Sequence, residues 1–103
     1  MDEKEQIRRD LLEQLDNRGM NQRFYTSLVD DYISLWETKE MLFKDIKERG
    51  VMTEWNNGGG QTGVKKNDCV PEVNRISASM LKILSELGLR GSNIKEVEPD
   101  AEM

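Results

Sequence analysis

Apolar residues recur every three or four positions in three stretches of the chain, which is the spacing of one face of an α-helix. This periodicity predicts helices over residues 3–18, 21–49 and 69–87. The second helix would be about 44 Å long at about 1.5 Å per residue. A helix of that length in a small protein packs along a neighbour, which is either the third helix of the same chain or another subunit.

Residues suited to helix ends flank each predicted helix. Short polar side chains cap the first amide groups of a helix, and glycine accepts the left-handed conformation that often follows its last turn. The predicted N-caps are Asp2, Asn21 and Asp68. The predicted stops are Gly19, Gly50 and Gly88.

An apolar seam runs along the two longer helices, and in the third helix it keeps a strict heptad spacing. We expect this seam to form the core of a helical hairpin and to contribute to contacts between subunits. Its residues are Tyr25, Leu28, Tyr32, Trp36, Leu42, Ile46, Val73, Ile76, Met80, Ile83 and Leu87.

The segment between the two long helices, residues 51–68, breaks the helical pattern. It contains two short β-prone stretches around Asn57-Gly58, which predicts either a glycine-rich loop or a small β-hairpin. The expected fold is therefore all-α, with a coiled-coil-like helical hairpin that assembles into an oligomer. Residues 1–90 form one domain in this interpretation, and residues 91–103 form an acidic tail that is expected to be disordered.

Composition excludes several classes of protein. The chain has no histidine and one cysteine, so it lacks the residues for a Ser-His-Asp triad, an imidazole base, a histidine-ligated metal or an internal disulfide. We expect no catalytic residues, no metal and no cofactor. No apolar run is long enough for a membrane span, and the N-terminus lacks the basic and apolar regions of a signal peptide. An intracellular protein without enzymatic activity is the expectation.

Three glycines, Gly58, Gly60 and Gly63, match the spacing G-x-G-x-x-G of nucleotide-binding loops. That motif works when a buried strand precedes it and a helix opens at its last glycine, so that the helix N-terminus meets phosphate. Here a long helix precedes the glycines and Val64 follows them. A turn is therefore the favoured interpretation.

Two groups of basic residues are candidates for contact with DNA phosphates. The chain carries 15 basic and 20 acidic residues, a net charge of −5, but residues 1–90 hold 14 basic and 16 acidic residues. Its folded part is thus close to neutral, and local basic groups can still meet DNA; solvated side chains of mixed charge are the other interpretation. The candidates are Arg8, Arg9, Arg18 and Arg23 near the N-terminus, and Lys65 and Lys66 beside the glycine-rich segment.

In the order and spacing of four segments, the chain resembles the small subunit of phage terminase, of a short type without an obvious helix-turn-helix. The resemblance covers about residues 11–89. The segments are 31–36 with Lys39 (DYISLW), 45–50 (DIKERG), 57–61 with Gly63 and 65–67 (NGGGQ and KKN), and 80–89 (MLKILSELGL). Members of the family often carry proline soon after the last segment, where this chain has Arg90-Gly91-Ser92.

This resemblance implies a non-catalytic DNA-packaging factor that works in the cytoplasm of the host cell. Small terminase subunits assemble into homo-oligomeric rings, recognise viral double-stranded DNA and deliver it to a large subunit that holds the ATPase and nuclease. By position in the chain, the acidic tail is the candidate contact for that large subunit. Its acidic residues are Glu96, Glu98, Asp100 and Glu102. The alternative interpretation is a coiled-coil adaptor or regulatory protein that acts through partner helices without binding DNA.

Overall fold

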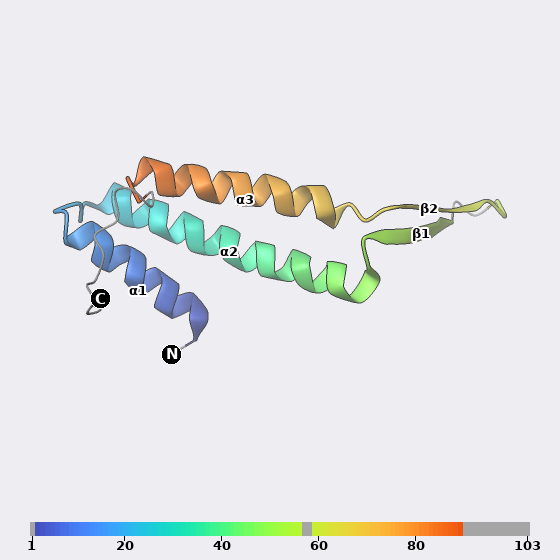
Figure 1. Cartoon of the computed structure of the whole chain (residues 1–103), viewed down its shortest axis with the longest axis horizontal. Coiled ribbons are helices and arrows are strands. Elements are labelled where there is room, and N and C mark those ends of the chain that lie inside the picture. Colours follow the sequence, from blue (N-terminus) through green and yellow to red (C-terminus); the bar gives the residue numbers. More distant parts are fainter. Residues whose placement is uncertain (1, 57–58, 90–103) are drawn as a thin grey trace, which may run out of the picture.

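The computed structural model describes residues 2–56 and 59–89 of the chain, which form three helices and one two-stranded antiparallel sheet. The second and third helices lie side by side and run in opposite directions, the first lies along the N-terminal half of the second, and the sheet extends beyond their far end (Figure 1). The longest dimension is 61 Å. In chain order the elements are α1 (Glu3–Asp16), α2 (Arg23–Arg49), β1 (Met52–Asn56), β2 (Thr62–Lys66) and α3 (Cys69–Glu86).

This arrangement confirms the predicted mostly helical fold, and it shows a small β-hairpin between the two long helices. The strands pair in register from Met52 opposite Lys66 to Asn56 opposite Thr62. Residues 57–61 join the strands, a longer connection than a two-residue Asn-Gly turn. The predicted turn residues Asn57 and Gly58, and the predicted tail of residues 91–103, lie outside the described residues.

The ends of α1 follow the prediction. The Asp2 carboxylate accepts a hydrogen bond from the backbone N–H of Glu5 at 2.9 Å, which satisfies one of the free amides of the first turn. Gly19 follows the helix with a φ of 71°, in the left-handed region that glycine adopts without strain.

Of the other two predicted N-caps, the one for α3 has the right position and the one for α2 is wrong. Gln22, not Asn21, is the N-cap of α2; its backbone carbonyl accepts the amides of Tyr25 and Thr26, and its side chain makes no capping bond. Asp68 occupies the N-cap position of α3, but its side chain also makes no capping bond. The Oδ1 of Asn67 instead accepts the N–H of Cys69 at 2.9 Å.

The core is concentrated where the three helices meet. Leu15 of α1, Val29 and Ile33 of α2, and Leu87 and Leu89 after α3 form one buried cluster. Every residue of the predicted seam is buried or half-buried, but Val29 and Ile33, which the seam omitted, are more buried than its α2 members. The reason is that α2 contacts α1 as well as α3, so it needs a wider apolar face than one seam provides.

None of the helices in the described part of the chain has the length and the apolar character needed to cross a membrane.

We predict that Leu15→Ala lowers the free energy of unfolding by about 2–5 kcal/mol, because the substitution removes a fully buried side chain and leaves a cavity in the core cluster. Urea unfolding followed by circular dichroism, at one protein concentration, measures the change. Leu81→Ala is the matched control, since the Leu81 side chain is 67% exposed, and we expect it to change the stability by less than about 0.5 kcal/mol. Equal losses in the two variants would contradict this placement of the core.

Candidate nucleic-acid interface

A single buried asparagine holds the hairpin on the helices. Asn67 lies between β2 and α3, and its side chain is 0% exposed although it is polar. Its backbone N–H donates to the carbonyl of Val51 at 2.7 Å, which continues the pairing of the two strands by one step toward the helices.

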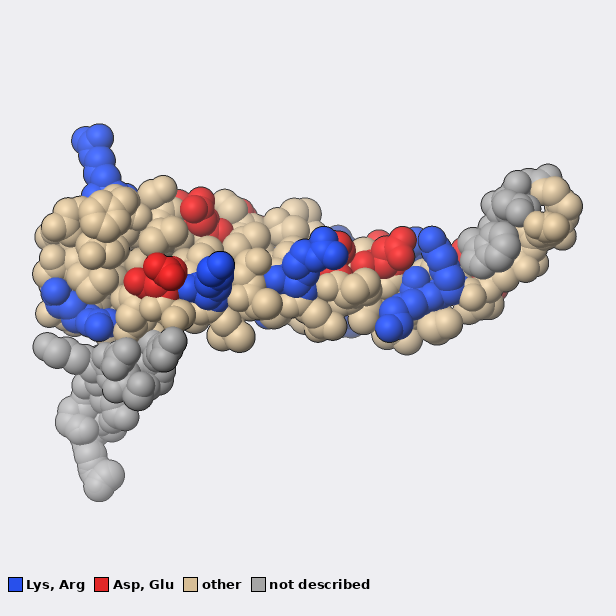
Figure 2. Space-filling view, turned by 90° about the horizontal axis from the view of Figure 1, so that it is seen from above, with Lys and Arg blue, Asp and Glu red and all other residues tan. Residues whose placement is uncertain are grey.

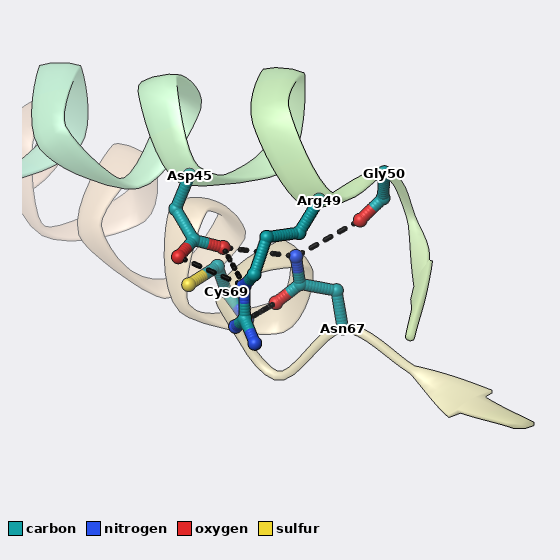
Figure 3. Close-up of polar contacts among 5 residues, drawn as sticks. All are labelled: Asp45, Arg49, Gly50, Asn67 and Cys69. Carbon is teal, nitrogen blue, oxygen red and sulfur yellow. Dashed lines mark hydrogen bonds and ion pairs between the residues drawn. The ribbon is translucent and has the colours of Figure 1, made fainter. Parts of the chain in front are cut away.

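The side-chain amide of Asn67 bonds to the end of α2 and to the start of α3 (Figure 3). Its Nδ2 donates to the Asp45 carboxylate of α2 at 3.0 Å and to the carbonyl of Gly50, the residue that ends α2, at 2.9 Å. Its Oδ1 accepts from Cys69 N–H at the start of α3 and, at 3.5 Å, from Arg49 Nη2. The two donors and the acceptor of this buried amide are therefore satisfied, as burial of a polar group requires.

Charged neighbours complete this junction. Arg49 Nε donates to both oxygens of Asp45 at 3.0 Å. The hydrogen bonds from Asn67 and then Arg49 lower the pKa of Asp45 below its ordinary value. The pKa of the Cys69 thiol is raised, first by burial and then by the Asp45 carboxylate, so the thiol stays protonated near neutral pH and is a poor nucleophile.

The hairpin carries two of the predicted DNA contacts. Lys65 and Lys66 are both exposed near the base of β2. Because successive side chains of a strand point to opposite faces, the two lysines lie on opposite faces of the hairpin. The Lys65 ammonium is 3.5 Å from the Asp68 carboxylate, a solvent-exposed pair that contributes little to stability and can exchange for another anion.

The four arginines of the N-terminal group have different surroundings. The Nε of Arg8 donates to Asp30 at 2.9 Å, which joins α1 to α2. The Nη1 of Arg18 donates to the carbonyl of Gly88 at 2.8 Å, and this contact ties the end of α1 to the end of α3. Arg9 and Arg23 are exposed.

An open groove of about 880 Å³ lies between α1 and α2. Its lining mixes basic and acidic side chains, among them Arg8, Arg9 and Asp30, over the apolar Leu12 and Ile33. Mixed charge of this kind does not favour a polyanion.

The fold does not bring the two predicted basic groups together within one chain. The arginines lie on α1 and around the α1–α2 connection, whereas the lysines lie on the hairpin at the opposite end of α2 (Figure 1). On the face shown in Figure 2, basic and acidic side chains alternate along the helices and do not form one basic stripe. The hairpin is therefore the better candidate for a nucleic-acid contact.

Comparison with known families decides the identity. A family model described as "Phage terminase, small subunit" matches residues 5–103. The chain belongs to this family. No curated protein and no solved structure matches it.

As a terminase small subunit, the protein has a role in the packaging of phage DNA, and its family is generally non-catalytic. Within the described residues there is no group of three or more His, Cys, Asp or Glu side chains placed to hold a metal ion. Sequence reasoning missed Asn67, although an asparagine just before a helix is a capping signal. The neighbouring Asp68 is also a common capping residue, so the sequence did not indicate which of the two side chains makes the capping bond.

We predict that Asn67→Ala destabilises this terminase subunit by about 1–3 kcal/mol, because the partly buried Gly50 carbonyl and Cys69 amide lose their partner. Urea unfolding measures the loss. Asn74→Ala is the matched control, since Asn74 is exposed on α3 and should change stability little. If both variants were equally stable, Asn67 would not be the anchor of the hairpin.

The lowered pKa of Asp45 predicts a dependence of stability on pH. A carboxyl group whose pKa is lower in the folded than in the unfolded chain stabilises the fold above its ordinary pKa, and this contribution is lost as the pH falls through the lowered value. Asp45→Asn should therefore unfold with a weaker dependence on acid than the natural chain. Stability measured from pH 7 downward tests this, with the exposed Asp31→Asn as control; identical acid profiles of the natural chain and Asp45→Asn would contradict it.

Proposed function

We propose that this terminase small subunit recognises viral double-stranded DNA through its β-hairpin, and that it delivers the DNA to the large ATPase and nuclease subunit in the host-cell cytoplasm. One observation carries the proposal: an exposed two-stranded hairpin extends beyond the helices and has a lysine on each face (Figure 1).

The shape of the hairpin suits the major groove of DNA. That groove is about 12 Å wide and admits an α-helix or a two-stranded β-ribbon. Phosphates line both of its edges, and Lys65 and Lys66 point to opposite faces of the hairpin. Each ammonium then lies toward a different phosphate backbone when the hairpin enters the groove.

Two lysines per chain make too few phosphate contacts for tight binding, so we propose that the subunits assemble into a ring. Repeated hairpins would multiply weak contacts with one DNA molecule into a useful overall affinity. The small core and the long paired helices support such an assembly, because a chain of this size buries little apolar surface by itself.

The large subunit needs its own contact. We propose the acidic residues Glu96, Glu98, Asp100 and Glu102 for it. They lie far along the sequence from Lys65 and Lys66, so DNA and the large subunit would use different segments.

We predict that Lys65→Glu with Lys66→Glu weakens binding to duplex DNA about tenfold or more. Each lost phosphate contact should also reduce the slope of log affinity against log salt concentration by about 0.9. Fluorescence anisotropy with a labelled duplex at several salt concentrations measures both quantities.

The matched control is Lys44→Glu with Lys82→Glu, which makes the same change of charge at exposed lysines on α2 and α3. This control should keep most of the affinity and the slope. If both double variants bind equally well, the hairpin is not the DNA contact. If the natural chain shows no affinity even at low salt, the alternative interpretation as an adaptor acting through partner helices is favoured.

A further inference from the structure

The hairpin has a face that its own chain leaves uncovered. Cross-strand pairing places Met52 opposite Lys66 and Glu54 opposite Val64, and side chains two positions apart on a strand share a face. These four side chains therefore lie at the corners of one face, which we call the pairing face, with the two apolar residues on one diagonal and the two charged residues on the other.

All four side chains of the pairing face are exposed. Met52 is 51% and Val64 is 62% exposed, so both apolar side chains are largely in contact with solvent. A lone two-stranded hairpin is only marginally stable in water, and it gains stability when a face packs against another element. The pairing face lacks such an element within the described chain.

The charges of the pairing face are also free. Glu54 and Lys66 take part in no ion pair with any residue that the structure describes, whereas the neighbouring Lys65 pairs with Asp68 on the other side of the hairpin. An exposed acid and an exposed base on one small apolar face define a surface that is complementary to itself.

We propose that the pairing face binds the same face of a second copy of this chain. Two hairpins can pack face to face with their strands nearly perpendicular, as orthogonal sheets do. A two-fold axis along the apolar diagonal then sets Met52 on the second copy's Met52 and Val64 on its Val64. The same rotation sets Glu54 of each copy on Lys66 of the other, so the contact contains two ion pairs.

A second copy is more complementary to the charged and apolar side chains of the pairing face than DNA is. A polyanion on the pairing face would meet Lys66 but would also meet Glu54, and it would leave the two apolar side chains in water. DNA also needs Lys66, so DNA and the second copy compete for the hairpin. We therefore expect the paired state in protein that is free of DNA.

The contact is too small to hold two chains alone, because stable interfaces bury about 800 Å² on each partner. It becomes effective when it is repeated, and this inference therefore rests on the proposed ring. Contacts within a ring join two different surfaces, whereas the pairing face is used by both copies in the same way. Hairpin pairing consequently joins two rings and gives an even number of chains.

Native mass spectrometry of the full-length chain without DNA tests the proposal. We expect the natural protein to contain twice the number of chains found in Glu54→Lys, which opposes two lysines across the contact. Lys66→Glu should also halve the assembly. The exchange of both charges, Glu54→Lys with Lys66→Glu, should restore the doubled mass, since each ion pair between the copies forms again with the acid and the base exchanged.

Lys65→Glu is the control, because Lys65 lies on the other face of the hairpin; it should weaken DNA binding and leave the doubled mass unchanged. Addition of duplex DNA should convert the doubled assembly of the natural protein into single rings. An odd number of chains, or a mass that Glu54→Lys does not change, would overturn the pairing. A chain that forms only dimers, which Glu54→Lys dissociates and the double exchange restores, would support the pairing and overturn the ring.

Discussion

The buried amide of Asn67 fixes the direction in which the hairpin leaves the helices. Gly50 ends α2 with a φ of 85°, a conformation that turns the chain sharply into β1, and a turn of this kind alone would leave the hairpin free to swing. Asn67 removes that freedom because it bonds the end of α2 and the start of α3 at the same time. Since Lys65 and Lys66 directly precede it, the position of both lysines relative to the helices depends on this one side chain.

The helical part of the molecule is unevenly packed, and α2 explains why. Its N-terminal half lies between α1 and α3 and holds the buried Val29 and Ile33, while its C-terminal half contacts α3 but lies beyond α1 (Figure 1). The largest buried cluster therefore lies at one end of the molecule, and the proposed DNA contact lies at the other. At the hairpin end, the hydrogen bonds around Asn67 hold the hairpin in a fixed position on the helices. At the other end, apolar packing holds the three helices together.

The sequence was sufficient for those features that depend on local periodicity or on one residue's conformation. The three helices follow from apolar spacing, and Asp2, Gly19 and Gly50 mark helix ends because their properties act within a few residues. The network of Asn67 could not be found this way, since Asp45 and Asn67 meet only after α2 and α3 have paired. Val29 and Ile33 were missed for a related reason: a search for one seam cannot show that α2 has two neighbours. For the candidate site, Lys65 and Lys66 could be identified from the sequence as basic residues beside the glycine-rich segment. Their placement on opposite faces of a hairpin could be established only from the strand register.

In the proposed function, an acidic chain must bind DNA with a few well-placed charges, and this requirement connects the hairpin to assembly. Mobile ions screen charges over about 8–10 Å, so the distant acidic residues matter less to a phosphate than those beside Lys65 and Lys66. One such neighbour, Asp68, already holds Lys65 in an exposed pair whose loss costs little, and phosphate can replace it. Two such lysines per chain give only weak binding, and their number grows only with the number of chains that present hairpins to the same DNA. A change that prevents assembly should therefore reduce DNA binding to that of a single chain, even when both lysines and their anchor are intact.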